Sequence, residues 1–337
     1  MNAKVKFAVV GLGNIGRRHL AVIDSDTNCK IVAICDIDES LCKHYSELYN
    51  ISTYFTDFEE MIKFGEFDVV SICTPHGLHC NMTILAAKSK KNVLVEKPMA
   101  LSVQDCELMI ESARENNIYL MVVKQNRFNK PIALTKQAIE SGKLGKIYSV
   151  VCNVLWNRNI EYYSKSDWRG KRNLEGGVLF TQVSHFLDLL IWWFGDVKKA
   201  KTFTQNFKHK IEIEDTGASI IEFESGVLGS LNWSTCVYGK NYEGSITIVG
   251  DKGTIKIGGQ YLNKIDYWDV ESYPLPEDIV FDDKPNSYGK YQGTSSNHNI
   301  VVEEVVKKLL NERGNVVEGN EGIKTIDAIE KIYKSII

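Results

Sequence analysis

The run Gly11-Leu12-Gly13-Asn14-Ile15-Gly16 constrains the fold more than any other feature of this sequence. It follows an apolar stretch at residues 5–11 and opens a helical pattern at 14–25. Its glycines have separate uses: Gly11 permits a tight turn, Gly13 lets the backbone approach a ligand, and Gly16 lets the helix pack on the strand. The start of a helix also offers N–H groups and a positive dipole end. A strand, this turn and a helix therefore predict a dinucleotide site.

The next apolar run, at residues 30–36, ends in an acid. Asp36 lies 20 residues beyond Gly16, where a carboxylate accepts hydrogen bonds from the adenine-side ribose and repels the 2′-phosphate of NADP. Arg17 and Arg18 are placed on the helix rather than after the second strand, so we expect NAD rather than NADP. Asn14 and Ile15 are expected to contact the cofactor from the turn.

Short apolar runs rich in Val and Ile alternate with helical segments through the first third of the chain. Near-continuous apolar strands are typical of a parallel sheet that is covered on both faces. This order predicts an α/β fold with a doubly wound, Rossmann-type parallel sheet over residues 1–124. The expected strands are 5–11, 30–36, 67–74, 92–98 and 118–123, and the expected helices are 14–25, 77–89 and 102–116.

The pattern changes after about residue 125. Several later runs alternate apolar and polar residues, as strands with one solvated face do, and VGDKGT at 249–254 is typical of a hairpin. Residues 125–337 are therefore predicted to form an α+β domain with an open, mostly antiparallel sheet, with the last helices free to pack back on the first domain. The expected strands are 147–156, 199–206, 216–223, 227–236, 244–249 and 253–258, and the expected helices are 129–142, 176–194, 297–312 and 322–336.

Composition excludes several classes of partner. The net charge is −3, so no global basic field attracts nucleic acid or a membrane, and no stretch of about 20 apolar residues predicts a membrane span. Eight cysteines without a C-x-x-C pair are typical of buried thiols in a reducing compartment. With no leader-like N-terminus, we expect a cytoplasmic protein. His76 and His79 have the spacing of metal ligands but lack a third one, so no metal is expected.

The triplet Glu96-Lys97-Pro98 ends the fifth predicted strand. A lysine there points into the crevice where doubly wound folds bind ligands, and its ammonium can polarise a reacting hydroxyl or carbonyl. Together with GLGNIG, TPHGLH at 74–79 and the α+β second half, this motif resembles the Gfo/Idh/MocA oxidoreductase family. The resemblance implies a catalytic Lys97, a C-terminal domain that flanks the active site, and cofactor contacts from Thr74, Pro75, His79, Glu96, Lys97 and Gln125.

The same resemblance implies a second catalytic residue, His185. The family has a D-x-G-x-H motif after a glycine pair, and this chain has Gly176-Gly177 followed by His185. An imidazole is a suitable general base near neutral pH. Thr181 replaces the family aspartate, which leaves open whether His185, Lys97 or water removes the proton.

A narrower likeness covers five further segments of the chain. These are KQNRFNKP, WNRN, EYYSKSDWRG, GGVLFTQVSHFLDLL and SSNHN. They resemble a group of bacterial enzymes that oxidise the 3′-hydroxyl of UDP-N-acetyl-2-amino-2-deoxyglucuronate (UDP-N-acetylglucosaminuronate) during the synthesis of surface polysaccharides such as O-antigen. The resemblance implies a nucleotide-sugar substrate, a homo-oligomer with a tetramer favoured and, as in some members, reoxidation of bound NADH by 2-oxoglutarate.

The residue types of these segments suit such a substrate. Arginine pairs with carboxylates and phosphates, so Arg158 and Arg169 are expected to bind the charged groups. Asn157 and Gln182 are expected to form hydrogen bonds with the acetamido group or the ring hydroxyls. Trp168 and Arg169 are expected to lie beside the nicotinamide. The uridine side is expected to contact Tyr288, Ser295, Asn297 and His298, in this subunit or a neighbouring one.

Three alternatives remain open at this point. The first is oxidation of a free polyol or sugar such as myo-inositol, although a neutral substrate has little use for the arginines between residues 157 and 169. The second is a non-catalytic NAD-binding regulator, against which Lys97 and His185 both argue. The third is an NAD-dependent glycoside hydrolase, which would begin with the same oxidation.

Overall fold

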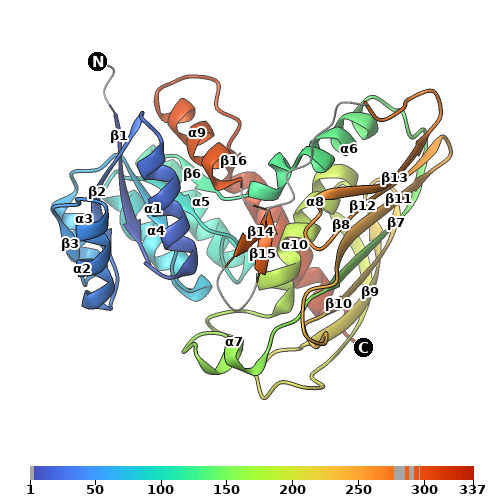
Figure 1. The fold of residues 1–337 in the computed structure, drawn as a ribbon, viewed down its shortest axis with the longest axis horizontal. Helices are drawn as coiled ribbons and strands as arrows, with labels where there is room; N and C mark the ends of the chain where they lie inside the picture. Colours follow the sequence, from blue (N-terminus) through green and yellow to red (C-terminus); the bar gives the residue numbers. More distant parts are fainter. Residues whose placement is uncertain (1–3, 277–284, 288–291, 296) are drawn as a thin grey trace. The chain divides into compact units, whose positions relative to one another are not determined.

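The computed structural model describes residues 4–276, 285–287, 292–295 and 297–337. The chain divides into two compact units, each with its own seven-stranded sheet (Figure 1). The first unit is Met1–Lys124 with His298–Ile326, and the second is Gln125–Asn297 with Asp327–Ile337. A segment from the C-terminal part of the chain therefore completes the N-terminal unit.

The first unit contains the predicted doubly wound sheet. Its strand order is β16-β6-β5-β4-β1-β2-β3, and every pairing is parallel except that of β16 with β6. The order reverses between β1 and β4, and ligands bind at such a point beyond the carboxyl ends of the strands. The strands are β1 Val5–Val10, β2 Cys29–Cys35, β3 Tyr54–Phe55, β4 Val69–Ile72, β5 Asn92–Val95, β6 Leu120–Val122 and β16 Val317–Glu318.

Helices connect these strands, and side-chain caps fix where several of them begin. Asp38, Asp57 and Ser102 each accept a hydrogen bond from a backbone N–H of the helix that follows. The sequence analysis did not predict α2, α3, β3 or β16. The helices of this unit are α1 Asn14–Ser25, α2 Glu39–Leu48, α3 Phe58–Phe64, α4 His79–Lys88, α5 Val103–Asn116, α9 His298–Leu309 and the first part of α10 Gly319–Lys334, with a 3₁₀ turn η1 His76–Leu78.

The second unit contains the predicted open sheet. Its order is β13-β12-β11-β7-β10-β9-β8, and among the strands that the structure describes there only β10 and β7 pair in parallel. Gly250 pairs with Gly253, which confirms the two-residue hairpin. The strands are β7 Ile147–Leu155, β8 Val197–Gln205, β9 Thr216–Phe223, β10 Leu228–Ser234, β11 Glu243–Gly250, β12 Gly253–Gly258 and β13 Lys264–Val270, with the separate pair β14 Pro285–Ser287 and β15 Gln292–Ser295.

One face of this sheet is buried and the other is exposed. Ile221, Phe223 and Trp233 lie in the core, whereas Phe203 and Ile220 are exposed. Helix α8 Ser184–Phe194 is buried almost throughout, and a π-helical turn at Leu179–Val183 precedes it, where a single helix was expected. The other helices of this unit are α6 Lys130–Glu140, α7 Ile160–Ser164 and the end of α10, with a 3₁₀ turn η2 Gln125–Phe128. Among the described residues, no helix is both long and apolar enough to cross a membrane.

Candidate active site

The glycine turn between β1 and α1 has the geometry that a bound dinucleotide requires. Gly11 has a φ of +86°, and a Cβ there would lie 2.7 Å from the Cys73 carbonyl oxygen. A Cβ on Gly16 would collide with the Gly11 carbonyl oxygen. Gly13 is exposed, and a Cβ there would meet no protein atom within 4 Å. The first and third glycines are therefore needed for folding, whereas the second faces space into which a ligand can come.

The surroundings of the turn also fit the phosphates and ribose of NAD. In the part of the chain that the structure describes, no side chain caps the N-terminus of α1, so its first N–H groups can receive a pyrophosphate. The two carboxylate oxygens of Asp36 accept the Leu12 N–H at 2.6 Å and the Asp38 N–H at 3.0 Å. Each oxygen keeps a lone pair for a ribose hydroxyl. The Asn14 side chain pairs with the Arg17 guanidinium.

His79 connects the two loops that follow β4 and β5. Its ring is buried, with Nδ1 2.9 Å from the Pro98 carbonyl oxygen and Nε2 3.0 Å from the Thr74 carbonyl oxygen. Burial lowers the pKa of His79. Both ring nitrogens face backbone carbonyl oxygens, one from each loop. His79 therefore holds the two loops together. Thr74 and Pro75, which precede it, are partly exposed.

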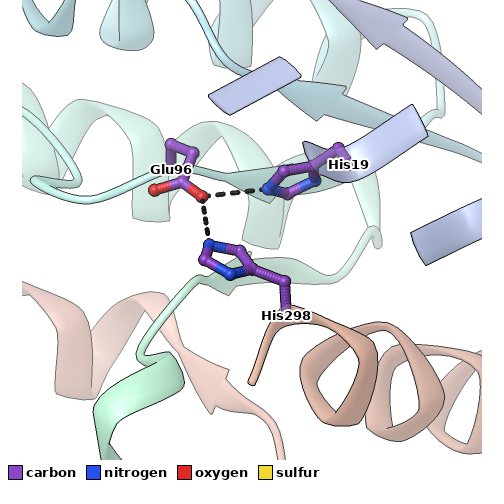
Figure 2. Close-up of side chains that lie close together, drawn as sticks. All are labelled: His19, Glu96 and His298. Atoms are coloured by element: carbon purple, nitrogen blue, oxygen red, sulfur yellow. Dashed lines mark hydrogen bonds and ion pairs between the residues drawn. The ribbon is translucent and has the colours of Figure 1, made fainter. Parts of the chain in front are cut away.

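Lys97 follows β5 and is partly exposed, whereas its neighbour Glu96 is only 4% exposed. The Lys97 N–H donates to Glu96 Oε2 at 3.0 Å, and Glu96 Oε1 faces His19 and His298 (Figure 2). His298, expected beside the uridine, is thus buried in the first unit. The sequence analysis overlooked His19, although it lies on the buried face of α1 with Leu20 and Ile23.

In the second unit, two predicted substrate arginines lie against one aromatic ring. The guanidinium carbons of Arg158 and Arg169 are 5.2 and 4.1 Å from the ring centroid of Tyr162. Gln182 donates to the Tyr162 hydroxyl at 3.1 Å. Arg158 is only 4% exposed and also donates to the Asn241 side chain at 3.3 Å. The structure therefore brings Arg158, Arg169 and Gln182 together around Tyr162.

A buried acid that the sequence analysis missed lies beside this group. Glu175 is completely buried and accepts a hydrogen bond from the Gly170 N–H, and the Thr181 side chain lies beside its carboxyl group. Burial raises the pKa of Glu175, against the opposing effect of Arg169 and Arg158. Thr181, which replaces the family aspartate, therefore contacts a carboxyl group after all. The signal that could have revealed Glu175 is its place, as an acid, inside the run NLEGGVLF.

His185 lies in the first turn of α8 and is 6% exposed. One turn later, Asp188 forms a bidentate ion pair with Arg127, at 2.8 and 2.9 Å, so this arginine after the sixth strand serves as a structural partner.

The Asn157 side chain donates a hydrogen bond to the Val237 carbonyl oxygen. Trp168 is partly exposed, and its ring centroid lies 5.3 Å from the Arg169 guanidinium carbon.

Two other predicted residues, Asn297 and Gln125, are in contact with each other. Asn297 donates to Asn129 Oδ1 at 2.6 Å and to the carbonyl of the buried Gln125 at 3.4 Å. Ser295 is the last residue of β15, and Tyr288 lies outside the described residues.

Two clusters of described residues have side chains of the type that binds metals: His19, Glu96 and His298, and His209, Asp215 and Cys236. The sequence analysis predicted neither. In the second cluster, Asp215 accepts the N–H groups of Phe207, Lys208 and His209. Burial alone would raise the Asp215 pKa, but these N–H donors lower it to about 2. The carboxylate therefore braces a loop.

Comparisons with known proteins agree with this geometry. The family model for the oxidoreductase family with an NAD-binding Rossmann fold (GFO/IDH/MocA) matches residues 5–124, and the model for the GFO/IDH/MocA C-terminal domain matches residues 132–256. Among curated proteins, myo-inositol 2-dehydrogenase from Thermotoga maritima is 26% identical over 259 residues, which are 74% of each protein.

Two solved structures are more similar. The WlbA dehydrogenase from Bordetella pertussis, in complex with NADH and UDP-GlcNAcA, is 33% identical with a TM-score of 0.89, covering 98% of this chain and 96% of that one. The WlbA dehydrogenase from Chromobacterium violaceum, with the same two ligands, is 33% identical with a TM-score of 0.91, covering 99% and 94%. The chain therefore belongs to the Gfo/Idh/MocA family of NAD-dependent oxidoreductases, and it is a dehydrogenase of the sugar type.

Proposed function

We propose that this enzyme oxidises the 3′-hydroxyl of a UDP-N-acetylglucosaminuronate-type nucleotide sugar. The observation that carries the proposal is the pair of arginines around Tyr162, the buried Arg158 and the partly exposed Arg169. Both guanidinium groups lie close enough to the buried Glu175 carboxyl to act against the burial that raises its pKa. Two guanidinium groups beside one ring suit an anionic substrate, because arginine pairs with carboxylates and phosphates. The UDP-GlcNAcA in both WlbA structures is such an anion.

The proposed chemistry uses Lys97 and His185. Lys97 would donate a hydrogen bond to the reacting hydroxyl and stabilise the charge that develops on its oxygen. His185 would accept the hydroxyl proton as the C3′ carbonyl forms. The bound nicotinamide supplies the acceptor for the hydride that leaves C3′, so the products are a ketone, NADH and one proton. The Thr181–Glu175 contact would hold the turn before α8 and so orient His185.

We propose the other substrate contacts from the types of the side chains. Asn157 and Gln182 would bond the acetamido group or the ring hydroxyls, and Trp168 would cover the nicotinamide edge. Tyr288, Ser295 and Asn297 would contact the uridine or its phosphates, in this subunit or a neighbour. His298 would reach the uridine only with a rearrangement, because its ring is buried beside Glu96.

A polyol such as myo-inositol is the second candidate substrate, because a relative with that activity is 26% identical. A neutral polyol has no carboxylate or phosphate with which Arg158 and Arg169 could pair, so we favour the uronate.

We further propose a cytoplasmic tetramer in a surface polysaccharide pathway. All eight cysteines are free, which suits a reducing compartment. The exposed side chains Val151, Phe203, Ile220 and Leu228 on the second sheet would form an interface between subunits, because such apolar faces mark interaction sites. Sedimentation of the parent and of Ile220→Lys tests this, with a smaller assembly expected for the variant. An unchanged assembly would exclude this face as the interface.

The substrate is tested by following the absorbance of bound nicotinamide. Purified enzyme is mixed with UDP-N-acetylglucosaminuronate, other UDP-uronates or myo-inositol, with and without 2-oxoglutarate. We expect reduction only with a UDP-uronate, and reoxidation when 2-oxoglutarate is added. Turnover of myo-inositol without any response to a UDP-uronate would contradict the substrate assignment. Arg158→Gln should raise KM for the uronate by about tenfold or more, since a buried charged contact is lost.

A further inference from the structure

Three buried side chains from distant parts of the sequence meet behind Lys97. His19 comes from α1, Glu96 follows β5, and His298 is the first residue of α9 (Figure 2). His19 and His298 are each 1% exposed and Glu96 is 4% exposed. All three belong to the first unit. The predicted chemistry uses none of them directly, so a polar cluster this deeply buried requires its own explanation.

The contacts make Glu96 the acceptor at the centre of the cluster. Its Oε1 atom is 2.9 Å from His19 Nε2 and 3.3 Å from His298 Nε2. Its Oε2 atom accepts the backbone N–H of Lys97 at 3.0 Å. An ionised carboxylate only accepts hydrogen bonds, so it suits the His19 and Lys97 donors and the nearby His298 imidazole better than a neutral acid does. Glu96 thus fixes the peptide group from which the Lys97 side chain departs.

The three side chains of the cluster shift one another's pKa values in different directions. Burial would lower the pKa of His19, but the neighbouring Cys73 and Glu96 outweigh this effect and raise it to about 10. Burial opposes ionisation of Glu96, yet the hydrogen bonds from the two imidazoles keep its pKa well below the usual range. Burial lowers the pKa of His298. These shifts favour a charged His19 beside an ionised Glu96, and His19 Nδ1 lies 2.7 Å from Ser71 Oγ.

A metal ion is the rival explanation for two histidines and a carboxylate. Zinc would lie about 2.0–2.2 Å from each ligand atom, with the ligands arranged around it. Here both imidazole nitrogens approach the same carboxylate oxygen at hydrogen-bond distances, and the other carboxylate oxygen is engaged by a backbone N–H. The geometry favours hydrogen bonding, and a bound metal becomes one outcome of the test.

We propose that Glu96 and His298 are positioning residues for Lys97, and that His19 supplies the counter-charge that keeps Glu96 ionised. The inference rests on the proposed role of Lys97 in hydride transfer. Because an error of about 1 Å in the placement of a reacting group can cost about 100-fold in rate, a fixed Lys97 peptide has direct value for catalysis. The first residue of α9 would then take part in arranging a catalytic group that belongs to β5.

A matched pair of substitutions at residue 298 tests the role of the contact between His298 Nε2 and Glu96 Oε1. His298→Gln keeps an N–H donor near the position of the imidazole Nε2, whereas His298→Leu has a similar volume and no donor. We expect kcat of the Leu variant to fall by about tenfold or more, with KM for the nucleotide sugar and Kd for NADH within about twofold of the parent. The Gln variant should recover most of kcat. His44→Gln, an exposed histidine on α2, is the control and should change nothing.

A spectroscopic readout tests the charge assignment without relying on activity. Nitrogen NMR of labelled histidine should show a doubly protonated His19 ring at about pH 8, below its pKa of about 10. In Glu96→Gln the same ring should become neutral, because its counter-charge is lost. Metal analysis of protein purified without a histidine tag should find no stoichiometric ion.

Three results would overturn the inference: equal kcat values for His298→Leu and His298→Gln, a neutral His19 in the parent, or one equivalent of metal that Glu96→Gln removes. Failure of the proposed function is distinguished by Lys97→Ala. If that variant stays active, Lys97 has a different role. If it is inactive while both His298 variants turn over like the parent, only the positioning inference fails.

Discussion

At the residue scale, Gly13 and Gly16 allow cofactor binding and folding to be tested separately. A Cβ on Gly13 enters open space, whereas one on Gly16 collides with the Gly11 carbonyl. Gly13→Ala should therefore keep Tm within about 2 °C of the parent and raise Kd for NADH by about tenfold or more, because a methyl group would occupy space needed by the pyrophosphate. Thermal unfolding and NADH fluorescence titration measure the two effects.

Gly16→Ala is the matched comparison. It adds the same methyl group where the helix meets the turn, so it should lower Tm by several degrees as well as weakening NADH binding. An unchanged NADH affinity in Gly13→Ala would place the dinucleotide elsewhere.

The substitution Lys97→Ala tests whether this side chain acts in catalysis rather than in cofactor binding. The variant should bind NADH like the parent but lose about 100- to 10,000-fold in kcat, the range for removal of an acid–base group. Isothermal titration with NADH and steady-state rates with the nucleotide sugar measure these two properties. Lys63→Ala, an exposed lysine on α3, should leave both unchanged. A Lys97→Ala enzyme with full activity would refute the catalytic assignment.

Some residues of the site could be predicted from the sequence alone, and others could not. The glycines, Asp36 and Lys97 could be predicted because each lies at a defined place beside a strand end. His19 and Glu175 could not be assigned roles, because their partners are distant in the sequence and only the fold brings them together. Arg158, Arg169 and His185 were identified from the family resemblance rather than from their spacing.

At the element scale, Glu214 links the turn before α8 to the last helix. Its Oε1 atom accepts the Tyr333 hydroxyl at 2.7 Å and the Val178 N–H at 3.1 Å. Burial raises its pKa from 4.5 to about 7. A carboxyl with a raised pKa stabilises the fold fully below pH 4.5, and this contribution is lost as pH rises through about 7.

This linkage predicts that the parent loses about 2 kcal/mol of stability from this group between pH 5 and pH 8, allowing for its partial exposure. Glu214→Gln keeps an acceptor oxygen and removes the titration, so its stability should be flatter over that range. Urea denaturation at the two pH values provides the measurement. Identical pH dependence in the two proteins would show that Glu214 is ionised in both states.

The elements themselves could be predicted where the pattern was long. The strands at 5–11 and 30–36 and the helices at 14–25 and 102–116 needed only small changes of their ends. Strands β3 and β16 are two residues long, too short to give a periodic signal. The π-helical turn before α8 depends on hydrogen bonds one residue wider than in an α-helix, and no residue pattern marks it.

At the scale of the whole molecule, the C-terminal segment completes the N-terminal unit. Strand β16 pairs with β6 as the edge of the first sheet, and α9 packs against α1. Lys124 also donates to the Thr325 hydroxyl at 2.9 Å in the buried interior. The boundary predicted from the sequence placed residues 125–337 in the second domain and left the last helices free to pack back on the first, because helical periodicity does not reveal which sheet a helix covers.

A chain that ends at residue 297 should therefore lose NADH binding and cooperative unfolding, because it lacks α9 and β16. Co-expression with a separate fragment of residues 298–337 should restore part of both, as the missing contacts are non-covalent. Calorimetry and NADH fluorescence detect this. Normal NADH affinity in the shortened chain would mean that the first 124 residues form a complete unit.

The central claim is that a hydride moves from C3′ of a UDP-linked uronate to NAD, with Lys97 beside the reacting oxygen. It is tested most directly with UDP-N-acetylglucosaminuronate that carries deuterium at C3′, followed by mass spectrometry of the NADH formed in a single turnover. The account predicts deuterated NADH from the parent enzyme and, over the same reaction time, at most about one hundredth as much from Lys97→Ala. Unlabelled NADH from the deuterated sugar, or labelled NADH from both enzymes in equal yield, would contradict it.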